Sequence, residues 1–153
     1  MEIEGIDRLV IGVKNMDRAL AFFGDVLGVR FTEIEGEAPA VSGCRLAISL
    51  DKQLELISPV AAPRLVTNPP DPLELRRRLE NADAVLYALI FKTGDVNAAI
   101  ANAERHGIRV AGTRVAFPRD EQLRVSDFDE VALAEEDTFG IKMALSQYDR
   151  DPA

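Results

Sequence analysis

The sequence has few of the residues on which many protein chemistries depend. It contains one cysteine, one histidine, two tyrosines and no tryptophan. A single cysteine cannot form a disulfide within the chain, and a single histidine cannot supply a multi-histidine metal site. Glycine-rich phosphate loops, paired-cysteine zinc motifs and a serine nucleophile elbow are missing as well. These absences exclude several common classes of enzyme.

Positive charge and long apolar runs are also scarce. The chain carries 18 lysines and arginines against 26 aspartates and glutamates, a net charge of −8. An acidic protein is not attracted to nucleic-acid phosphates or anionic lipid, so we expect neither as a partner. No stretch approaches the ~18 apolar residues of a membrane span, and no secretory signal is visible. The expected location is the cytoplasm.

What the sequence does contain is a globular pattern of strands and helices. It has 153 residues, 47% of them hydrophobic. Alternating apolar residues predict a strand over 6–13, helical spacing follows from Asp17, and Gly28 is typical of a helix end. Three further strands are predicted over 29–35, 44–50 and 53–58. The first 58 residues therefore form one βαβββ module.

The pattern then repeats after a proline-rich linker. Five prolines fall in residues 59–83, which favours a linker with one short helix over 72–80. An offset of 80 residues then aligns Arg8 with Ala88. A strand is predicted over 85–92 and a helix over 96–106, followed by strands over 108–110, 114–117, 122–125, 130–134 and 141–147. We assign residues 84–148 to a second βαβββ module and residues 149–153 to a tail.

Four segments in this order resemble a known family. They are IDRLVIGVKNMDRALAFFGDVLG, QLELISP, YALIFKTGDVNAAIANAERHGI and EEDTFGIKMALSQY. They are similar to the vicinal oxygen chelate superfamily, which includes glyoxalase I, methylmalonyl-CoA epimerase, extradiol dioxygenases and bleomycin-resistance proteins. The resemblance implies an α+β fold, in which two βαβββ modules form a curved mixed sheet with a concave cup and helices on the convex side. It also implies a homodimer.

The resemblance further implies where a metal ion would be held. In metal-using relatives, each module contributes one ligand from its first strand and one from its last strand. Those four positions fall on Arg8, Glu55, Ala88 and Ala144 of this chain. Only Glu55 can ligate a cation, so we expect no metal and no other cofactor.

Arg8, at the first of these positions, is the starting point for predicting the binding site. Side chains alternate across a strand, so Arg8 shares the cup with Lys92, Lys142 and Ser146, whereas Ile11 and Val13 face the helices. We expect Arg8 to pair with Glu55. The pair is either a structural ion pair or the binding site for an anionic group, because a guanidinium matches a carboxylate or phosphate.

Three functions fit these residues. The first is a metal-independent protein that binds a small organic molecule in the cup, with Arg8, Glu55, Lys92, Lys142 and Ser146 around the ligand. The second is a metal-free lyase or isomerase, in which Glu55 is the general base and Arg8 stabilises an oxyanion. The third is an interaction module with a vestigial cup. A metal-dependent glyoxalase or dioxygenase-type enzyme would require a different alignment.

Overall fold

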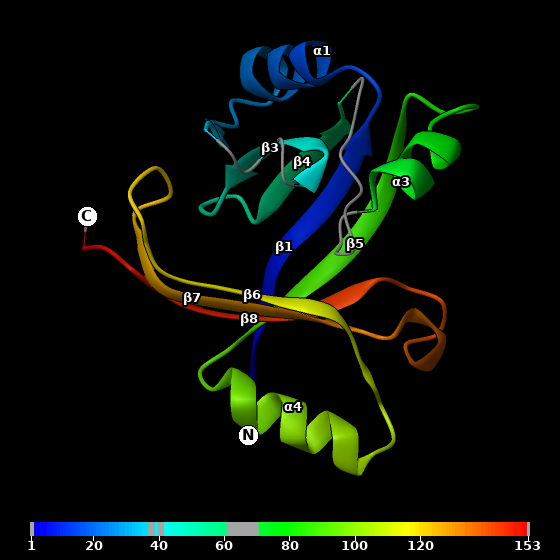
Figure 1. The fold of residues 1–153 in the computed structure, drawn as a ribbon. Helices are drawn as coiled ribbons and strands as arrows, with labels where there is room; N and C mark the ends of the chain where they lie inside the picture. The colour runs from blue at the N-terminus through cyan, green and yellow to red at the C-terminus, as the bar shows by residue number, and fades with distance from the viewer. Residues whose placement is uncertain (1, 37–38, 40–41, 61–70, 153) are drawn as a thin grey trace. The chain divides into compact units, whose positions relative to one another are not determined.

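The computed structural model describes residues 2–36, 39, 42–60 and 71–152 (Figure 1). The chain divides into two compact units. Residues 9–87 form the N-terminal unit, and residues 1–8 together with 88–153 form the C-terminal unit. Strands β1 (Ile3–Val13) and β5 (Ala84–Thr93) each contribute one end to both units.

The N-terminal unit contains a mixed sheet in the order β2-β3-β4-β1-β5. Strand β4 runs parallel to β1 and antiparallel to β3. The elements besides β1 and β5 are β2 (Thr32–Glu33), β3 (Cys44–Ser49), β4 (Leu54–Pro59), helix α1 (Met16–Ala21), its π-helical continuation η1 (Phe22–Val26) and helix α3 (Pro72–Arg78).

The two helices of this unit contact opposite faces of the sheet. Val13 and Leu56 are buried against Met16 of α1, with Ile11 packed beside them. Side chains alternate along the strand, so a side chain at Gly12 would lie on the face away from α1. A Cβ atom on Gly12 would lie 2.4 Å from Cδ1 of Leu75, which is fully buried on α3. The linker helix therefore covers the face away from α1.

The C-terminal unit repeats the arrangement with longer strands, in the order β1-β5-β8-β7-β6. Helix α4 packs on one face through Val96 and Ala99, which contact Val131 and Leu145 of the sheet. The elements besides β1 and β5 are α4 (Val96–Arg105), β6 (Val110–Asp120), β7 (Val125–Leu133), the 3₁₀ turn η2 (Glu135–Asp137) and β8 (Met143–Arg150).

The internal repeat predicted from the sequence is visible in matching details of the two units. Asn15 caps α1 by accepting the Arg18 N–H at 2.9 Å, and Asp95 caps α4 by accepting the Ala98 N–H at the same distance. The strand registers also correspond. Val10 pairs with Glu55 in the N-terminal unit, and Ile90, which lies 80 residues after Val10, pairs with Ala144 in the C-terminal unit. The α+β class and the βαβββ order are confirmed.

The strands of the second half differ from the sequence prediction. The strands predicted over 108–110 and 114–117 are one long strand, β6, interrupted by a bulge between Ala111 and Val115. The strand predicted over 122–125 is wrong, because residues 121–124 form the turn between β6 and β7. Pro118 lies within β6, which is the last strand in the order, where a missing N–H is tolerated.

One smaller difference concerns the first half of the chain. The strand predicted over 29–35 is reduced to the two residues of β2. In the described part of the chain, no helix has both the length and the apolar character needed to cross a membrane.

Candidate functional site

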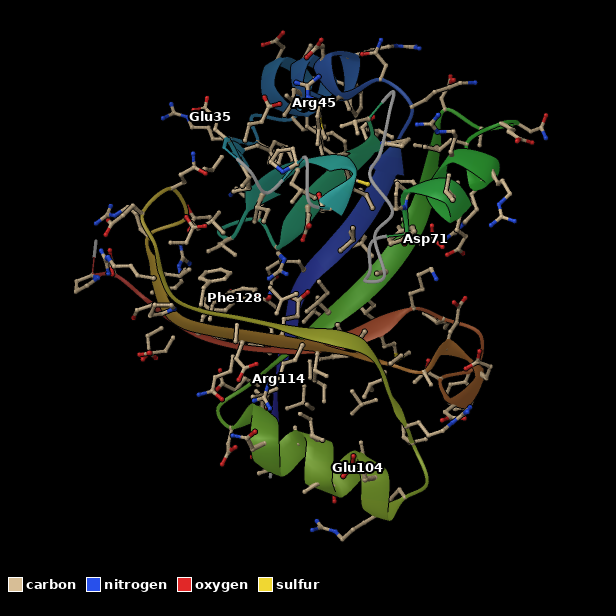
Figure 2. All side chains as sticks on the ribbon, in the orientation of Figure 1. Glu35, Arg45, Asp71, Glu104, Arg114 and Phe128 are labelled. Carbon is tan, nitrogen blue, oxygen red and sulfur yellow. The ribbon has the colours of Figure 1, made fainter. Side chains whose placement is uncertain are left out.

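A cluster of polar and aromatic side chains occupies one face of the C-terminal unit. Phe91 and Leu145 pack against α4, so alternation directs Lys92 and Ser146 to the face away from α4. Figure 2 shows the same division across β6 and β7, with Phe128 on the face away from α4 and Arg114 on the α4 side. The cluster comprises Asp7, Arg8, Lys92, Phe117, Phe128, Glu130, Ser146 and Tyr148.

Asp7 is the centre of the hydrogen bonds in this cluster. Its side chain is 3% exposed, and its carboxylate accepts hydrogen bonds from the guanidinium of Arg8 and the hydroxyl of Tyr148. The Ser146 hydroxyl also donates to it at 2.9 Å. Three donors from two strands therefore hold one buried carboxylate, which is the usual way in which a buried charge is stabilised.

Arg8 is fixed between two acids. Besides Asp7, Nη2 of Arg8 donates to Oε2 of Glu130 at 2.5 Å, and the Arg8 side chain is 3% exposed. Its guanidinium carbon also lies 5.9 Å from the centroid of the Phe128 ring. Arg8 is therefore a rigidly placed cation whose charge is balanced within the unit.

Three aromatic rings form a row across β6, β7 and β8. The Phe117 and Phe128 rings are parallel within 3°, with centroids 4.6 Å apart. The Phe128 and Tyr148 rings follow at 5.8 Å and 16°. Lys92 ends the row on β5, with Nζ 4.3 Å from the Tyr148 centroid. The row places an ammonium beside an aromatic surface, an arrangement that stabilises the cation.

Lys92 differs from Arg8 in its charge partners. Its side chain is partly buried. Among the described residues, its ammonium has no carboxylate within ion-pair distance and only the contact with the Tyr148 ring. Lys92 is thus a partly desolvated cation without a counter-ion in the part of the chain that the structure describes.

The other two predicted site residues lie elsewhere. Nζ of Lys142 is 2.8 Å from Oε2 of Glu135, at the start of β8. Glu55 belongs to the N-terminal unit, where it is 9% exposed and shares the face away from α1 with Gly12. The structure therefore brings together Arg8, Lys92 and Ser146. The pairing of Arg8 with Glu55 stays a prediction.

The four positions at which the resemblance implies metal ligands do not fit a divalent ion. Ala88 and Ala144 carry no ligating atom, and Arg8 is a cation held by carboxylates. Nor does the described part of the chain gather three or more histidine, cysteine, aspartate or glutamate side chains in a group that could hold a metal. We therefore derive no chemical step through a metal.

Two buried groups of the protein have raised pKa values. Burial, reinforced by the hydrogen bond to Asp7, raises the pKa of Tyr148 above its usual value of 10. Burial, followed by the nearby charge of Glu55, raises the pKa of the Cys44 thiol to about 12. A thiol with so high a pKa is not a nucleophile at neutral pH, so Cys44 is a buried structural residue.

We expect alkaline pH to destabilise the protein through Tyr148. Above pH 10 the unfolded chain releases the Tyr148 proton while the folded chain keeps it, so the free energy of unfolding falls as pH rises. The Cys44 thiol, whose usual pKa is 9, also lowers the free energy of unfolding as the pH rises above 9. Urea denaturation between about pH 8 and about pH 11 should show a shallower fall for Tyr148→Phe than for the wild type. Equal slopes would contradict the role of Tyr148.

Five members of the cluster were not predicted as site residues from the sequence. Tyr148 follows Ser146 by two positions, so extending the alternation of β8 would have found it, but the predicted strand stopped at Gln147. Alternation assigns Asp7 to the face opposite Arg8 and gave no signal. Phe128 lies outside the strand predicted over 130–134, whereas β7 begins at Val125. Phe117 and Glu130 lie inside predicted strands, but nothing in the sequence assigned these strands to the cup.

Comparison with known proteins agrees with this fold. No curated protein sequence matches the chain. Solved structures with similar folds include methylmalonyl-CoA epimerase from Mycobacterium tuberculosis, which is 17% identical with a TM-score of 0.69 over 98% of this chain and 90% of that one. Another is the Streptomyces coelicolor methylmalonyl-CoA epimerase in complex with 2-nitronate-propionyl-CoA, at 19% identity and TM-score 0.65 over 95% and 98%. Such low identities establish the fold alone.

The family itself is established by sequence. Residues 7–126 match the profile of the glyoxalase, bleomycin resistance protein and dioxygenase superfamily. The match spans most of the first module, the linker and much of the second. The repeated βαβββ units, with corresponding caps and registers, agree with it. This chain therefore belongs to the glyoxalase/bleomycin resistance protein/dioxygenase superfamily.

Proposed function

We propose that this protein binds a small organic molecule through an anionic group, without a metal ion, on the face of the C-terminal unit away from α4. The observation that carries the proposal is the partly buried ammonium of Lys92, for which the described residues provide no carboxylate partner. Partial burial removes some of the water that would otherwise solvate this charge. A ligand carboxylate would restore the lost interaction.

The residues beside Lys92 support a prebuilt site. Arg8 contributes a second positive charge on the cluster, although Asp7 and Glu130 already balance it. Because these contacts hold Arg8 in one geometry, little side-chain entropy is lost when a ligand binds nearby. Tyr148 and Phe128 offer apolar surface next to the charges. We therefore expect a carboxylate-bearing molecule with an apolar portion.

The proposal is tested by thermal unfolding in the presence of candidate ligands. The panel contains small aromatic and aliphatic carboxylates, acyl-CoA esters, cationic aromatic drugs and divalent metal ions. A ligand at 100 times its dissociation constant adds about 2.7 kcal/mol to the free energy of unfolding. Stabilisation by carboxylates supports the proposal. Stabilisation confined to manganese, nickel or iron would overturn it and favour a metal-dependent enzyme.

Substitution of Lys92 is the sharper test of the site. Lys92→Met keeps the apolar stem over Tyr148 but removes the charge, and we expect at least about tenfold weaker binding of the best carboxylate, or about 1.4 kcal/mol. Lys92→Arg should retain most of the affinity. Lys142→Met is the matched control, because Lys142 already pairs with Glu135. If the control weakens binding as much as Lys92→Met, the ligand does not contact Lys92.

Arg8→Ala is the less informative variant. It should also abolish binding, but it leaves Asp7 and Glu130 without their shared cation. Loss of binding would then be difficult to separate from loss of structure. Glu55→Gln, in the N-terminal unit, should alter binding only modestly.

A metal-free lyase or isomerase is the second candidate, and the folds of the two epimerases favour it. In this candidate, Glu55 is the general base that would remove a proton next to a carbonyl. Incubating the protein with methylmalonyl-CoA in deuterated water distinguishes the candidates. Deuterium incorporation that Glu55→Gln abolishes would establish catalysis. Binding without exchange would support the binding protein.

A further inference from the structure

Phe139 is an unusual residue in the turn between η2 and β8. Its side chain is 94% exposed, more than any other large hydrophobic residue in the described part of the chain. Its backbone φ angle is +63°, a conformation that is strained for a bulky side chain. The fold thus holds an aromatic ring in water and in an unfavourable backbone conformation. Such features persist where they serve a function.

The turn that carries Phe139 is firmly built. The hydroxyl of Thr138, a residue only 6% exposed, donates to the Ile141 carbonyl at 2.7 Å. The Gly140 N–H donates to the Glu135 carbonyl at 2.9 Å. These bonds close the turn on both sides of Phe139. The ring is therefore presented on a fixed support.

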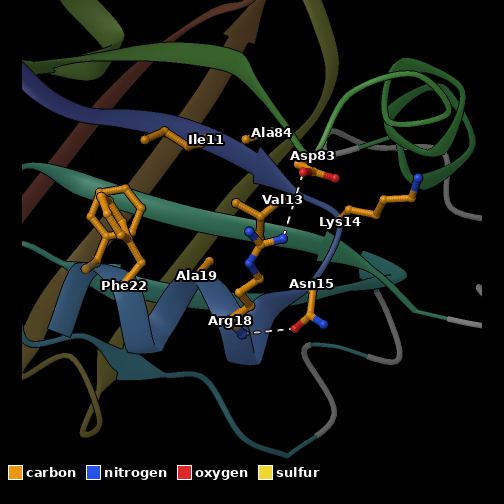
Figure 3. Close-up of a pocket in the computed structure, with 10 residues that line it drawn as sticks. Ile11, Val13, Lys14, Asn15, Arg18, Ala19, Phe22, Asp83 and Ala84 are labelled. Atoms are coloured by element: carbon orange, nitrogen blue, oxygen red, sulfur yellow. Dashed lines mark hydrogen bonds and ion pairs between the residues drawn. The ribbon is translucent and has the colours of Figure 1, made fainter. Parts of the chain in front are cut away.

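A groove on the N-terminal unit is suited to receive such a ring. It has a volume of about 730 Å³ and lies between α1 and the strand ends of β1 and β5 (Figure 3). Phe22, which is 50% exposed, forms one wall and meets Phe23 edge-to-face at 5.4 Å. The lining is Ile11, Val13, Ala19, Phe22, Phe23 and Ala84, with Lys14, Asn15, Arg18 and Asp83 among the polar residues.

We propose that Phe139 of one copy of this protein inserts into the groove of a second copy. Both surfaces lie on the same chain, and an aromatic ring meets edges and faces of other rings favourably. The groove carries a net charge of +1 from Lys14, Arg18 and Asp83. The segment preceding Phe139 is acidic, and its three acids outnumber the two cations paired with them. The contact therefore joins surfaces of opposite charge.

The same charges argue against a membrane as the partner. Glu135, Glu136 and Asp137 lie two to four residues before Phe139, which carries the exposed ring. Anionic lipid would repel these carboxylates as the ring approached the surface. A protein groove with cations at its edge does not carry that penalty.

Disulfide trapping between two variants tests the contact directly. Cys44 is fully buried, so introduced cysteines are the reactive ones. Phe139→Cys is mixed with Ala19→Cys, which lies in the groove, or with Leu86→Cys, an exposed position outside it. After mild oxidation, mass spectrometry of the digested proteins quantifies each heterodisulfide. We expect at least tenfold more of the 139–19 product than of the 139–86 product, and equal yields would overturn the proposal.

Sedimentation of the unmodified protein provides the second test. The wild type should associate in a concentration-dependent manner, and Phe139→Asn should weaken association at least tenfold. The isolated variant should also melt a few degrees higher at low protein concentration, because asparagine tolerates a positive φ angle. Leu86→Asn should associate as the wild type does. A wild type that stays monomeric, or a Phe139→Asn variant that associates normally, would overturn the proposal, as would binding of a monomer to anionic vesicles through Phe139.

Discussion

Replacing Asp7 with alanine should destabilise this protein by about 3–5 kcal/mol, the usual cost of removing one partner from a buried ion pair. The Asp7 carboxylate accepts hydrogen bonds from Arg8, Tyr148 and Ser146, and both charged side chains of the pair are 3% exposed. Without Asp7, the Arg8 guanidinium loses one of the carboxylates that hold it, and the Tyr148 and Ser146 hydroxyl groups lose the acceptor that they share. Urea denaturation at neutral pH measures the loss.

Two further variants make the result specific. Asp7→Asn keeps an oxygen for the two hydroxyl groups but removes the charge, so it should lose less stability than Asp7→Ala. Asp149→Ala removes an exposed acid from the same sheet and should change stability by at most about 0.5 kcal/mol. A loss below about 1 kcal/mol for Asp7→Ala would show that the network contributes little to the fold.

Leu75→Ala should have the next largest effect, about 2–5 kcal/mol of lost stability. Leu75 is fully buried, and its side chain occupies the space that the absent Cβ of Gly12 leaves open. Truncation creates a cavity between α3 and β1. Leu73→Ala, on the same helix but 54% exposed, should cost far less. Thermal and urea unfolding of the two variants provide the comparison.

A double-mutant cycle shows whether Gly12 and Leu75 are coupled. Gly12→Ala alone should destabilise by about 1–3 kcal/mol, because the new methyl group would lie 2.4 Å from Leu75 Cδ1 and 3.1 Å from Val85 Cγ2. In the Leu75→Ala background, the same methyl group partly fills the cavity, so the cost should fall or change sign. Strict additivity would show that α3 does not pack against Gly12.

Regular patterns explain which features of the fold could be predicted. The 80-residue offset predicted that α1 and α4 begin at equivalent positions, and the caps at Asn15 and Asp95 agree. Alternation placed Lys92 and Ser146 on one face, because both lie within regular β-strands. Such patterns repeat along the chain, so a single sequence is sufficient to recognise them.

The remaining features depend on contacts that no local pattern reveals. Asp7 and Arg8 are adjacent in β1, where alternation would direct their side chains to opposite faces. The two side chains nevertheless bind each other, because Ser146 and Tyr148 of β8 hold the Asp7 carboxylate in place. The proline-rich linker was recognised by composition, yet composition does not indicate that Leu75 packs above Gly12. The strand predicted over 114–117 ends before Pro118. A proline within a strand is tolerated at a sheet edge, and only the strand order shows that β6 is an edge strand.

The division of the chain between its two units has a consequence for folding during synthesis. Residues 9–87 are contiguous, so the N-terminal unit can complete its contacts while later residues are still being translated. The C-terminal unit cannot, because Asp7 lies 139 residues before Ser146 and 141 before Tyr148. Asp7 and Arg8, which are buried in the folded protein, therefore stay in contact with water until β8 has left the ribosome. Bringing β1 and β8 together closes a loop of about 140 residues, which is intrinsically slow.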